Sequence, residues 1–112
     1  MRENTKNLAK IFKTLNDENR LKILLFIYEN ECQCENGLSC RNETCIKDLS
    51  KLLNITTPTI SHHIKELVNA GLIITKKEGK WVYCKINRKA FEKAYIFSSK
   101  FLNNKGRNYK KN

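Results

Sequence analysis

Residues 56–71 have the sequence TTPTISHHIKELVNAG, which carries the start, the core face and the end of one helix. Proline in the first turn is typical of a helix N-terminus, so Pro58 marks the start and the hydroxyl of Thr56 is the expected cap. Gly71 can adopt the left-handed conformation that often ends a helix. Four apolar residues recur on one face at helical spacing: Ile60, Ile64, Leu67 and Val68. We therefore predict a helix over 57–70 with one buried face.

The segments on either side of this helix predict a DNA-binding architecture. Apolar spacing predicts a short helix over 45–53, and a three-residue link joins it to the helix 57–70 in a helix-turn-helix unit. A β-hairpin follows, with strands 72–75 and 81–86 around the charged turn 76–80. This order of elements is that of a winged helix-turn-helix.

Three further helices complete the prediction. Apolar stripes predict helices over 4–15 and 88–102, and the dense apolar run 21–28 predicts a buried central helix. The fold class is therefore mainly α (α+β), with about five helices and a two-stranded β-hairpin wing. The predicted winged-helix DNA-binding and dimerisation domain covers 1–102, with a cysteine-rich insertion at about 30–45. The remaining residues, 103–112, are expected to form a frayed basic tail.

Length and charge narrow the function. The chain has 112 residues and a formal net charge of +11, which points to a polyanionic partner such as nucleic acid. We see no secretory signal and no apolar run long enough for a membrane span, so we expect a cytoplasmic protein. Paired catalytic carboxylates and a glycine-rich phosphate loop are also lacking, so we do not expect an enzyme.

The outward face of the helix 57–70 has the side chains expected of a DNA reader. The second helix of such a unit enters the major groove, where short hydroxyls, a histidine and a lysine can reach base edges and phosphates. Lysines of the hairpin can neutralise phosphates beside the groove. His63 lies next to the core face, and we expect it to be structural. The candidate DNA-binding residues are Thr56, Thr57, Thr59, Ser61, His62, Lys65, Lys76, Lys77 and Lys80.

Four of the five cysteines gather in one acidic segment, Glu29–Cys45. This segment holds four glutamates and one arginine, a net charge of −3, which leaves +14 on the rest of the chain. Four thiols within fourteen residues can converge on one soft ion, so the candidate metal ligands are Cys32, Cys34, Cys40 and Cys45. The same thiols also fit a structural four-thiolate Zn(II) site, a redox or persulfide switch, or an iron–sulfur cluster. Cys84 alternates with apolar residues on a strand and is the expected small buried hydrophobe.

Three motifs resemble those of the ArsR/SmtB family of metal-responsive repressors. They are the helix stretch Thr56–Ile73, the segment DENRLKIL at 17–24 and the wing segment GKWVY at 79–83. The resemblance covers roughly residues 5 to 102. It implies a homodimer, paired through the first and last helices, that represses an operon by binding double-stranded operator DNA until an inducer lowers its DNA affinity. Many family members have glutamine where this chain has Thr57, so the operator sequence is expected to differ from the commonest family sites.

The resemblance also bears on the cysteines. One family site lies at the start of the third helix, where a Cys-x-Cys-Asp-Leu pattern binds arsenite, antimonite, cadmium or lead. The matching stretch here is Cys45-Ile-Lys-Asp-Leu49, which keeps the first cysteine and has Lys47 in place of the second. The resemblance thus implies As(III)/Sb(III) or Cd(II)/Pb(II) as inducer at Cys45, with the upstream thiols compensating, and no organic cofactor. Another family site, on the last helix, uses Asp and His, and residues 88–102 contain neither.

Overall fold

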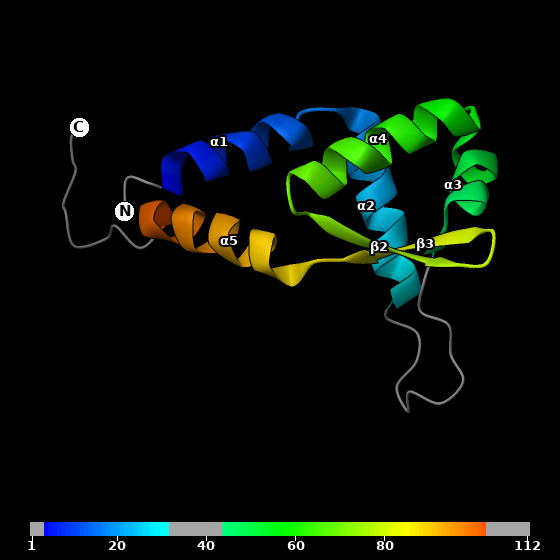
Figure 1. The fold of residues 1–112 in the computed structure, drawn as a ribbon. Helices are drawn as coiled ribbons and strands as arrows, with labels where there is room; N and C mark the ends of the chain where they lie inside the picture. The colour runs from blue at the N-terminus through cyan, green and yellow to red at the C-terminus, as the bar shows by residue number, and fades with distance from the viewer. Residues whose placement is uncertain (1–3, 32–43, 103–112) are drawn as a thin grey trace.

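The fold is a winged helix-turn-helix, as predicted. The structure, a computed structural model, describes residues 4–31 and 44–102. Its elements are α1 (Asn4–Leu15), α2 (Glu18–Glu31), β1 (Thr44–Cys45), α3 (Ile46–Leu53), α4 (Thr57–Asn69), β2 (Ile73–Glu78), β3 (Trp81–Ile86) and α5 (Arg88–Leu102). In Figure 1, α1 and α5 lie side by side at one end, whereas α3 and the tip of the hairpin lie at the other.

One hydrophobic core joins these elements. Every helix and the sheet contribute buried side chains, and those without measurable exposure are Ile11, Ile23, Ile27, Leu49, Ile60, Leu67 and Leu72. Burial of this kind holds α4 against α2, and α3 against α4 and the sheet, since each fully buried aliphatic side chain contributes about 1.5–3 kcal/mol. The helix-turn-helix therefore sits on a rigid base.

The prediction of a wholly buried central helix was wrong in part. Ile23 and Ile27 of α2 are fully buried, but Leu25 is 60% exposed and Leu21 and Tyr28 are exposed as well. These three lie at i, i+4 and i+7, so they form a stripe opposite the core. A helix that lies on one side of a small core buries only one of its faces. Helix α2 is apolar on two opposite faces, so one of them stays exposed. It also runs on through Asn30 and Glu31, which lie inside the insertion predicted at about 30–45.

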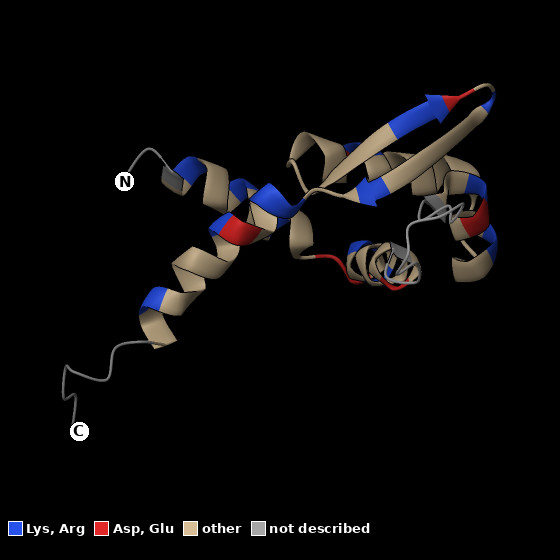
Figure 2. Cartoon of the chain, turned by 90° about the horizontal axis from the view of Figure 1, so that it is seen from below, with Lys and Arg blue, Asp and Glu red and all other residues tan. Residues whose placement is uncertain are grey.

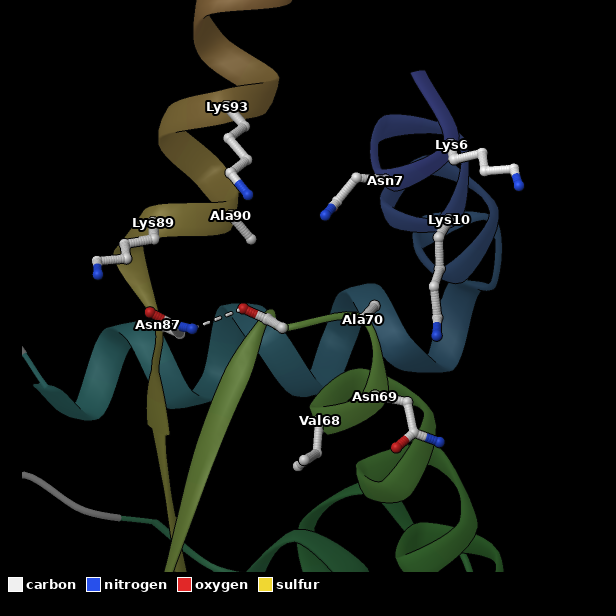
Figure 3. A pocket seen from close by; sticks show the side chains of 11 residues that line it. Lys6, Asn7, Lys10, Val68, Asn69, Ala70, Asn87, Lys89, Ala90 and Lys93 are labelled. Carbon is white, nitrogen blue, oxygen red and sulfur yellow. Dashed lines mark hydrogen bonds between the residues drawn. The ribbon is translucent and has the colours of Figure 1, made fainter. Parts of the chain in front are cut away.

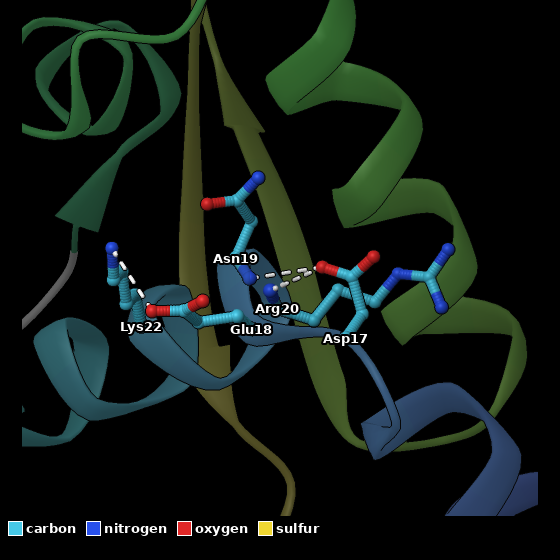
Figure 4. Close-up of polar contacts among 5 residues, drawn as sticks. All are labelled: Asp17, Glu18, Asn19, Arg20 and Lys22. Atoms are coloured by element: carbon cyan, nitrogen blue, oxygen red, sulfur yellow. Dashed lines mark hydrogen bonds and ion pairs between the residues drawn. The ribbon is translucent and has the colours of Figure 1, made fainter.

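A capping carboxylate sets the corner between α1 and α2. Asp17 Oδ1 accepts hydrogen bonds from the backbone N–H groups of Asn19 (2.9 Å) and Arg20 (3.1 Å), as Figure 4 shows. Burial alone would raise the pKa of Asp17, but the hydrogen bonds from the Arg20 and Asn19 N–H groups and the nearby Arg20 charge outweigh it, and the pKa is lowered. Glu18 and Lys22 add an exposed ion pair one turn apart (3.6 Å).

The sheet has three strands instead of the expected two. β3 lies between β2 and the two-residue β1, with Thr44 opposite Cys84 and Cys45 opposite Tyr83. Strand β2 also runs farther than predicted, to Glu78, so the turn of the wing is confined to the residues between Glu78 and Trp81. A two-residue strand carries no sequence pattern of its own, because only its partner defines it.

The ends of α1, α4 and α5 agree closely with the sequence, whereas α2 and α3 and the cap of α4 differ. Gly71 has a φ of +78° just after α4, as expected for a helix stop. Helix α3 starts at Ile46, because Cys45 is extended and belongs to β1. Thr56 precedes α4 without a side-chain capping bond, which corrects its predicted role.

Aromatic side chains of α1 and α5 pack on one another at the far end. Phe12 lies 5.7 Å from Phe97, and Phe97 lies 5.1 Å from Phe101, between ring centroids. Even so, Tyr95 is 72% exposed and Leu102 is 80% exposed. None of the helices in the described part combines the length and apolarity needed to cross a membrane.

Candidate nucleic-acid interface

The recognition helix α4 has the two faces that its sequence predicts. Ile60, Ile64 and Leu67 are buried, whereas the predicted readers Thr57, Thr59, Ser61, His62 and Lys65 are all exposed. Val68, which we expected in the core, is exposed because it lies at the edge of the buried stripe. The exposed face is thus continuous over the first two turns, and short hydrogen-bonding groups dominate it.

The start of α4 is ordered by hydroxyl contacts. Thr56 Oγ1 donates a hydrogen bond to Thr59 Oγ1 (3.0 Å) instead of capping the helix. Both hydroxyls are exposed and keep acceptor lone pairs free for a ligand. The structure therefore brings Thr56, Thr57 and Thr59 together at the leading end of the helix.

The side chain of Ser50 links α3 to α4, a contact that the sequence did not predict. Its Oγ donates to the Ile55 carbonyl (2.6 Å) and accepts from Thr57 Oγ1 (3.3 Å). Asn54, with a φ of 56°, forms the left-handed corner between the two helices. A serine in the last turn before a left-handed asparagine is the signal that could have identified this bridge.

His63 is structural, as expected. It is buried, and its Nδ1 accepts a hydrogen bond from Arg20 Nε (3.2 Å), while Arg20 Nη1 donates to the Thr14 carbonyl (3.2 Å). One guanidinium therefore connects α1, α2 and the recognition helix. This network fixes the orientation of α4 on the body.

The hairpin places its lysines beside this helix. Lys76 and Lys77 lie on β2 and Lys80 lies in the turn, all exposed and visible as blue segments toward the tip of the wing in Figure 2. Lys76 Nζ forms an ion pair with Glu78 Oε2 at 3.5 Å. The wing is therefore positively charged along its length and can approach a phosphate backbone.

A hollow of about 610 Å3 opens at the opposite end of α4, between α1 and α5. In Figure 3, Asn7 and Lys93 point toward each other across it, whereas Lys6 and Lys89 point away. Lys10 and Asn87 also line it, and no acidic side chain does. None of the predicted readers lies here, so the hollow adds to the positive field of the molecule without belonging to the reading face.

The candidate metal site is described at one residue only. Cys45 is the N-cap of α3 and is 8% exposed, with its backbone paired to Tyr83 of the wing. Cys32, Cys34 and Cys40 lie outside the described residues. Within 4–31 and 44–102, no three His, Cys, Asp or Glu side chains gather closely enough to hold a metal ion. The thiolate cluster therefore stays a prediction.

Cys84 is buried, as expected, and is 1% exposed on β3. Burial, and to a lesser degree the nearby Cys45 thiol, raises the pKa of the Cys84 thiol to about 12. Since the thiolate is the reactive and metal-binding form, Cys84 behaves as a packing residue at neutral pH.

Comparison with known proteins places this geometry in a family. Residues 38–75 match the profile of the arsR family of bacterial regulatory proteins. The cadmium resistance transcriptional regulatory protein CadC homolog of Staphylococcus aureus is 32% identical over 99 residues, which cover 85% of this chain and 73% of that protein. The arsenical resistance operon repressor of Escherichia coli K12 is 35% identical over 78 residues, or 70% of this chain and 57% of the repressor.

A solved structure agrees in fold. It is the homodimeric winged helix-turn-helix DNA-binding domain of a Mycobacterium bovis protein, with a TM-score of 0.63 and 16% identity over 96% of this chain and 88% of that one. The similarity to the CadC homolog over most of both chains, together with the matching profile, shows that the chain belongs to the ArsR family of DNA-binding transcriptional regulators.

Proposed function

We propose that the chain is a homodimeric repressor that binds operator DNA and is released by a thiophilic metal or metalloid at its cysteine cluster. The observation that carries the DNA-binding part is the exposed face of α4 beside a lysine-rich wing. Thr59, Ser61 and His62 are the proposed base readers, because short donors and acceptors at the start of such a helix reach base edges. Lys65, Lys76, Lys77 and Lys80 are the proposed phosphate contacts.

The dimer is proposed to form through α1 and α5. Tyr95, Phe101 and Leu102 are large apolar side chains that the single chain leaves exposed at one end. Contiguous exposed apolar surface of this kind marks an interface. Pairing these helices would place two copies of α4 side by side for two operator half-sites.

The inducer is proposed to bind Cys45 together with Cys32, Cys34 and Cys40. The support is chemical: thiolates prefer soft ions, and three or four of them suit arsenite, antimonite, cadmium or lead. Relatives of this chain are named for cadmium and arsenical resistance. The glutamates of the segment Glu29–Cys45 add negative charge, which favours the binding of a cation. A structural Zn(II) role for the same thiols is the alternative outcome.

The position of Cys45 offers a route from inducer to DNA. Cys45 begins α3, and α3 reaches the start of α4 through Ser50, whose hydroxyl contacts Ile55 and Thr57. A pull on Cys45 therefore changes the tilt of α3 and, through it, of α4. The inducer must favour the released conformation by the free energy that it removes from DNA binding, typically about 1–3 kcal/mol, or 5- to 150-fold.

A fluorescence anisotropy titration tests the proposal. An operator is first selected from random-sequence duplexes, and its affinity for the reduced protein is measured with arsenite, antimonite, cadmium, lead or zinc. We expect at least one of the first four to weaken binding at least about fivefold, and Cys45→Ser to abolish that response. Cys84→Ala, which removes a thiol outside the cluster, should keep it.

Other results would redirect the proposal. If no thiophilic ion changes the affinity but peroxide or polysulfide does, the redox alternative takes its place. If zinc stabilises the protein without changing DNA affinity, the cysteines form a structural site. If no duplex is selected over competitor DNA, the repressor function itself is wrong. A cytoplasmic location stays a prediction.

A further inference from the structure

Trp81, the one tryptophan of the sequence, lies close to two lysines from different elements. It begins β3 opposite Glu78 and is 40% exposed. Lys47 Nζ lies 5.4 Å from the centre of its ring, and Lys80 Nζ lies 5.7 Å from it. Lys47 belongs to the first turn of α3, whereas Lys80 belongs to the turn of the wing.

Both ammonium groups lie within the range of cation–π attraction. Both charges therefore lie within about 6 Å of the centre of one ring, which neutralises neither. Neither lysine forms an ion pair with a carboxylate in the part of the chain that the structure describes. Two exposed lysines beside one ring, without a carboxylate partner among the described residues, leave their positive charges available to an anion, so an anion at the edge of the ring would complete this arrangement.

The place of this cluster in the fold indicates which anion. Helix α3 and the wing flank the recognition helix, and both lie at the same end of the molecule in Figure 1. Lysines beside a helix that lies in the major groove face the sugar–phosphate backbone. Lys47 was not among the predicted DNA contacts, and its position is one where the family motif has a cysteine.

We infer that Lys47, Lys80 and Trp81 form a clamp for a phosphate of the DNA backbone next to the wing. In this clamp Lys47 and Lys80 contact the phosphate, and Trp81 is the positioning residue that holds them. This inference rests on the proposed DNA-binding function and adds a sequence-independent contact from α3. The alternative is that the three side chains only fasten the wing to α3.

The salt dependence of DNA binding tests the clamp. A mixed-sequence duplex serves as the probe, because a phosphate contact does not depend on sequence. Loss of one such contact lowers the slope of log affinity against log salt by about 0.9, so Lys47→Ala should lose about threefold less affinity than the wild type between about 50 and 200 mM salt. Lys100→Ala, on the last turn of α5, is the matched control and should keep the wild-type slope.

Two further measurements test the phosphate clamp. Trp81→Phe keeps an aromatic ring and should keep the wild-type slope, whereas Trp81→Leu should lower it, with circular dichroism verifying the fold of each. In the wild type, the duplex should protect Trp81 fluorescence from quenching by acrylamide. The wing-fastening alternative predicts the wild-type slope for Trp81→Leu; protection alone does not separate the two, because Lys80 beside Trp81 is already a proposed phosphate contact.

The outcomes distinguish the clamp from the proposed function. If the wild type binds the duplex but Lys47→Ala keeps the full slope, or if acrylamide reaches Trp81 equally with and without DNA, the clamp is wrong and DNA binding stands. If the wild type binds no duplex at any salt concentration, both are wrong.

Discussion

Replacing Ser50 with alanine should loosen the corner that joins α3 to the recognition helix. The Ser50 hydroxyl donates to the Ile55 carbonyl at 2.6 Å and accepts from Thr57 Oγ1 at 3.3 Å. Ile55 N–H donates to the Ser50 carbonyl (3.1 Å), a bond that the substitution leaves in place. The change therefore removes the side-chain half of the link and keeps the backbone half.

The expected cost follows from the exposure of each partner. Ile55 is half-buried, so its carbonyl regains water only in part, and the loss is about 1–2 kcal/mol of unfolding free energy. The Thr57 hydroxyl is exposed and finds water, which adds little. Because the corner also orients α4, affinity for a selected operator should fall by up to about tenfold. Affinity for mixed-sequence DNA should change far less.

Urea denaturation and operator titration measure the two effects. Ser50→Thr keeps the hydroxyl and should stay close to the wild type, and Ser98→Ala, exposed on α5, should change stability by no more than about 0.5 kcal/mol. If Ser50→Ala unfolds at the wild-type urea concentration with an unchanged slope, the carbonyl is solvated in the native state and the reasoning fails. Equal losses on operator and mixed-sequence DNA would show that Ser50 does not orient the reader.

Three other changes probe the cap, the core and the dimer. Asp17→Ala should lower the free energy of unfolding by about 1 kcal/mol near neutral pH. Because folding lowers the pKa of Asp17 below 3.8, the difference between the variant and the wild type should shrink as pH falls below about 4. Urea denaturation at neutral pH and below about pH 4 measures this difference. A difference that grows at low pH would contradict this sign. Ile60→Ala should cost about 2–5 kcal/mol because Ile60 is fully buried, and a loss under about 1 kcal/mol in the same assay would show that the core collapses around the gap. Phe101→Ala should raise the dimer dissociation constant at least about tenfold in analytical ultracentrifugation, and an unchanged constant would remove Phe101 from the interface.

Local signals explain why α1, α4 and α5 could be predicted almost to the residue. Pro58 and Gly71 mark the start and the end of a helix through their own local backbone preferences, and an apolar stripe can be recognised from the residues of its helix alone. The reading face of α4 follows directly, because burial of Ile60 and Ile64 leaves Ser61 and Lys65 outside. Nothing distant is required to make that inference.

Distant contacts explain what the sequence did not predict. Whether Leu25 of α2 is buried depends on which side of α2 the other helices occupy, and a helix apolar on two sides does not specify this. β1 exists only because Cys45 meets Tyr83 of a strand almost forty residues away. Lys47 and Trp81 meet for the same reason. The spacing of residues along the sequence does not predict which distant residues will pair in this way.

The placement of Cys45 fits the proposed regulation of DNA binding by a small change at this residue. Its backbone pairs with the wing, and its helix reaches α4 through Ser50, so one residue adjoins both elements that are proposed to contact DNA. A tenfold loss of DNA affinity requires about 1.4 kcal/mol. That is comparable to the value of the Ser50–Ile55 hydrogen bond with its half-buried carbonyl. An inducer that breaks this hydrogen bond by tilting α3 must supply the free energy of the bond as well as the free energy removed from DNA binding, and the sum is still smaller than the free energy that unfolding a domain requires.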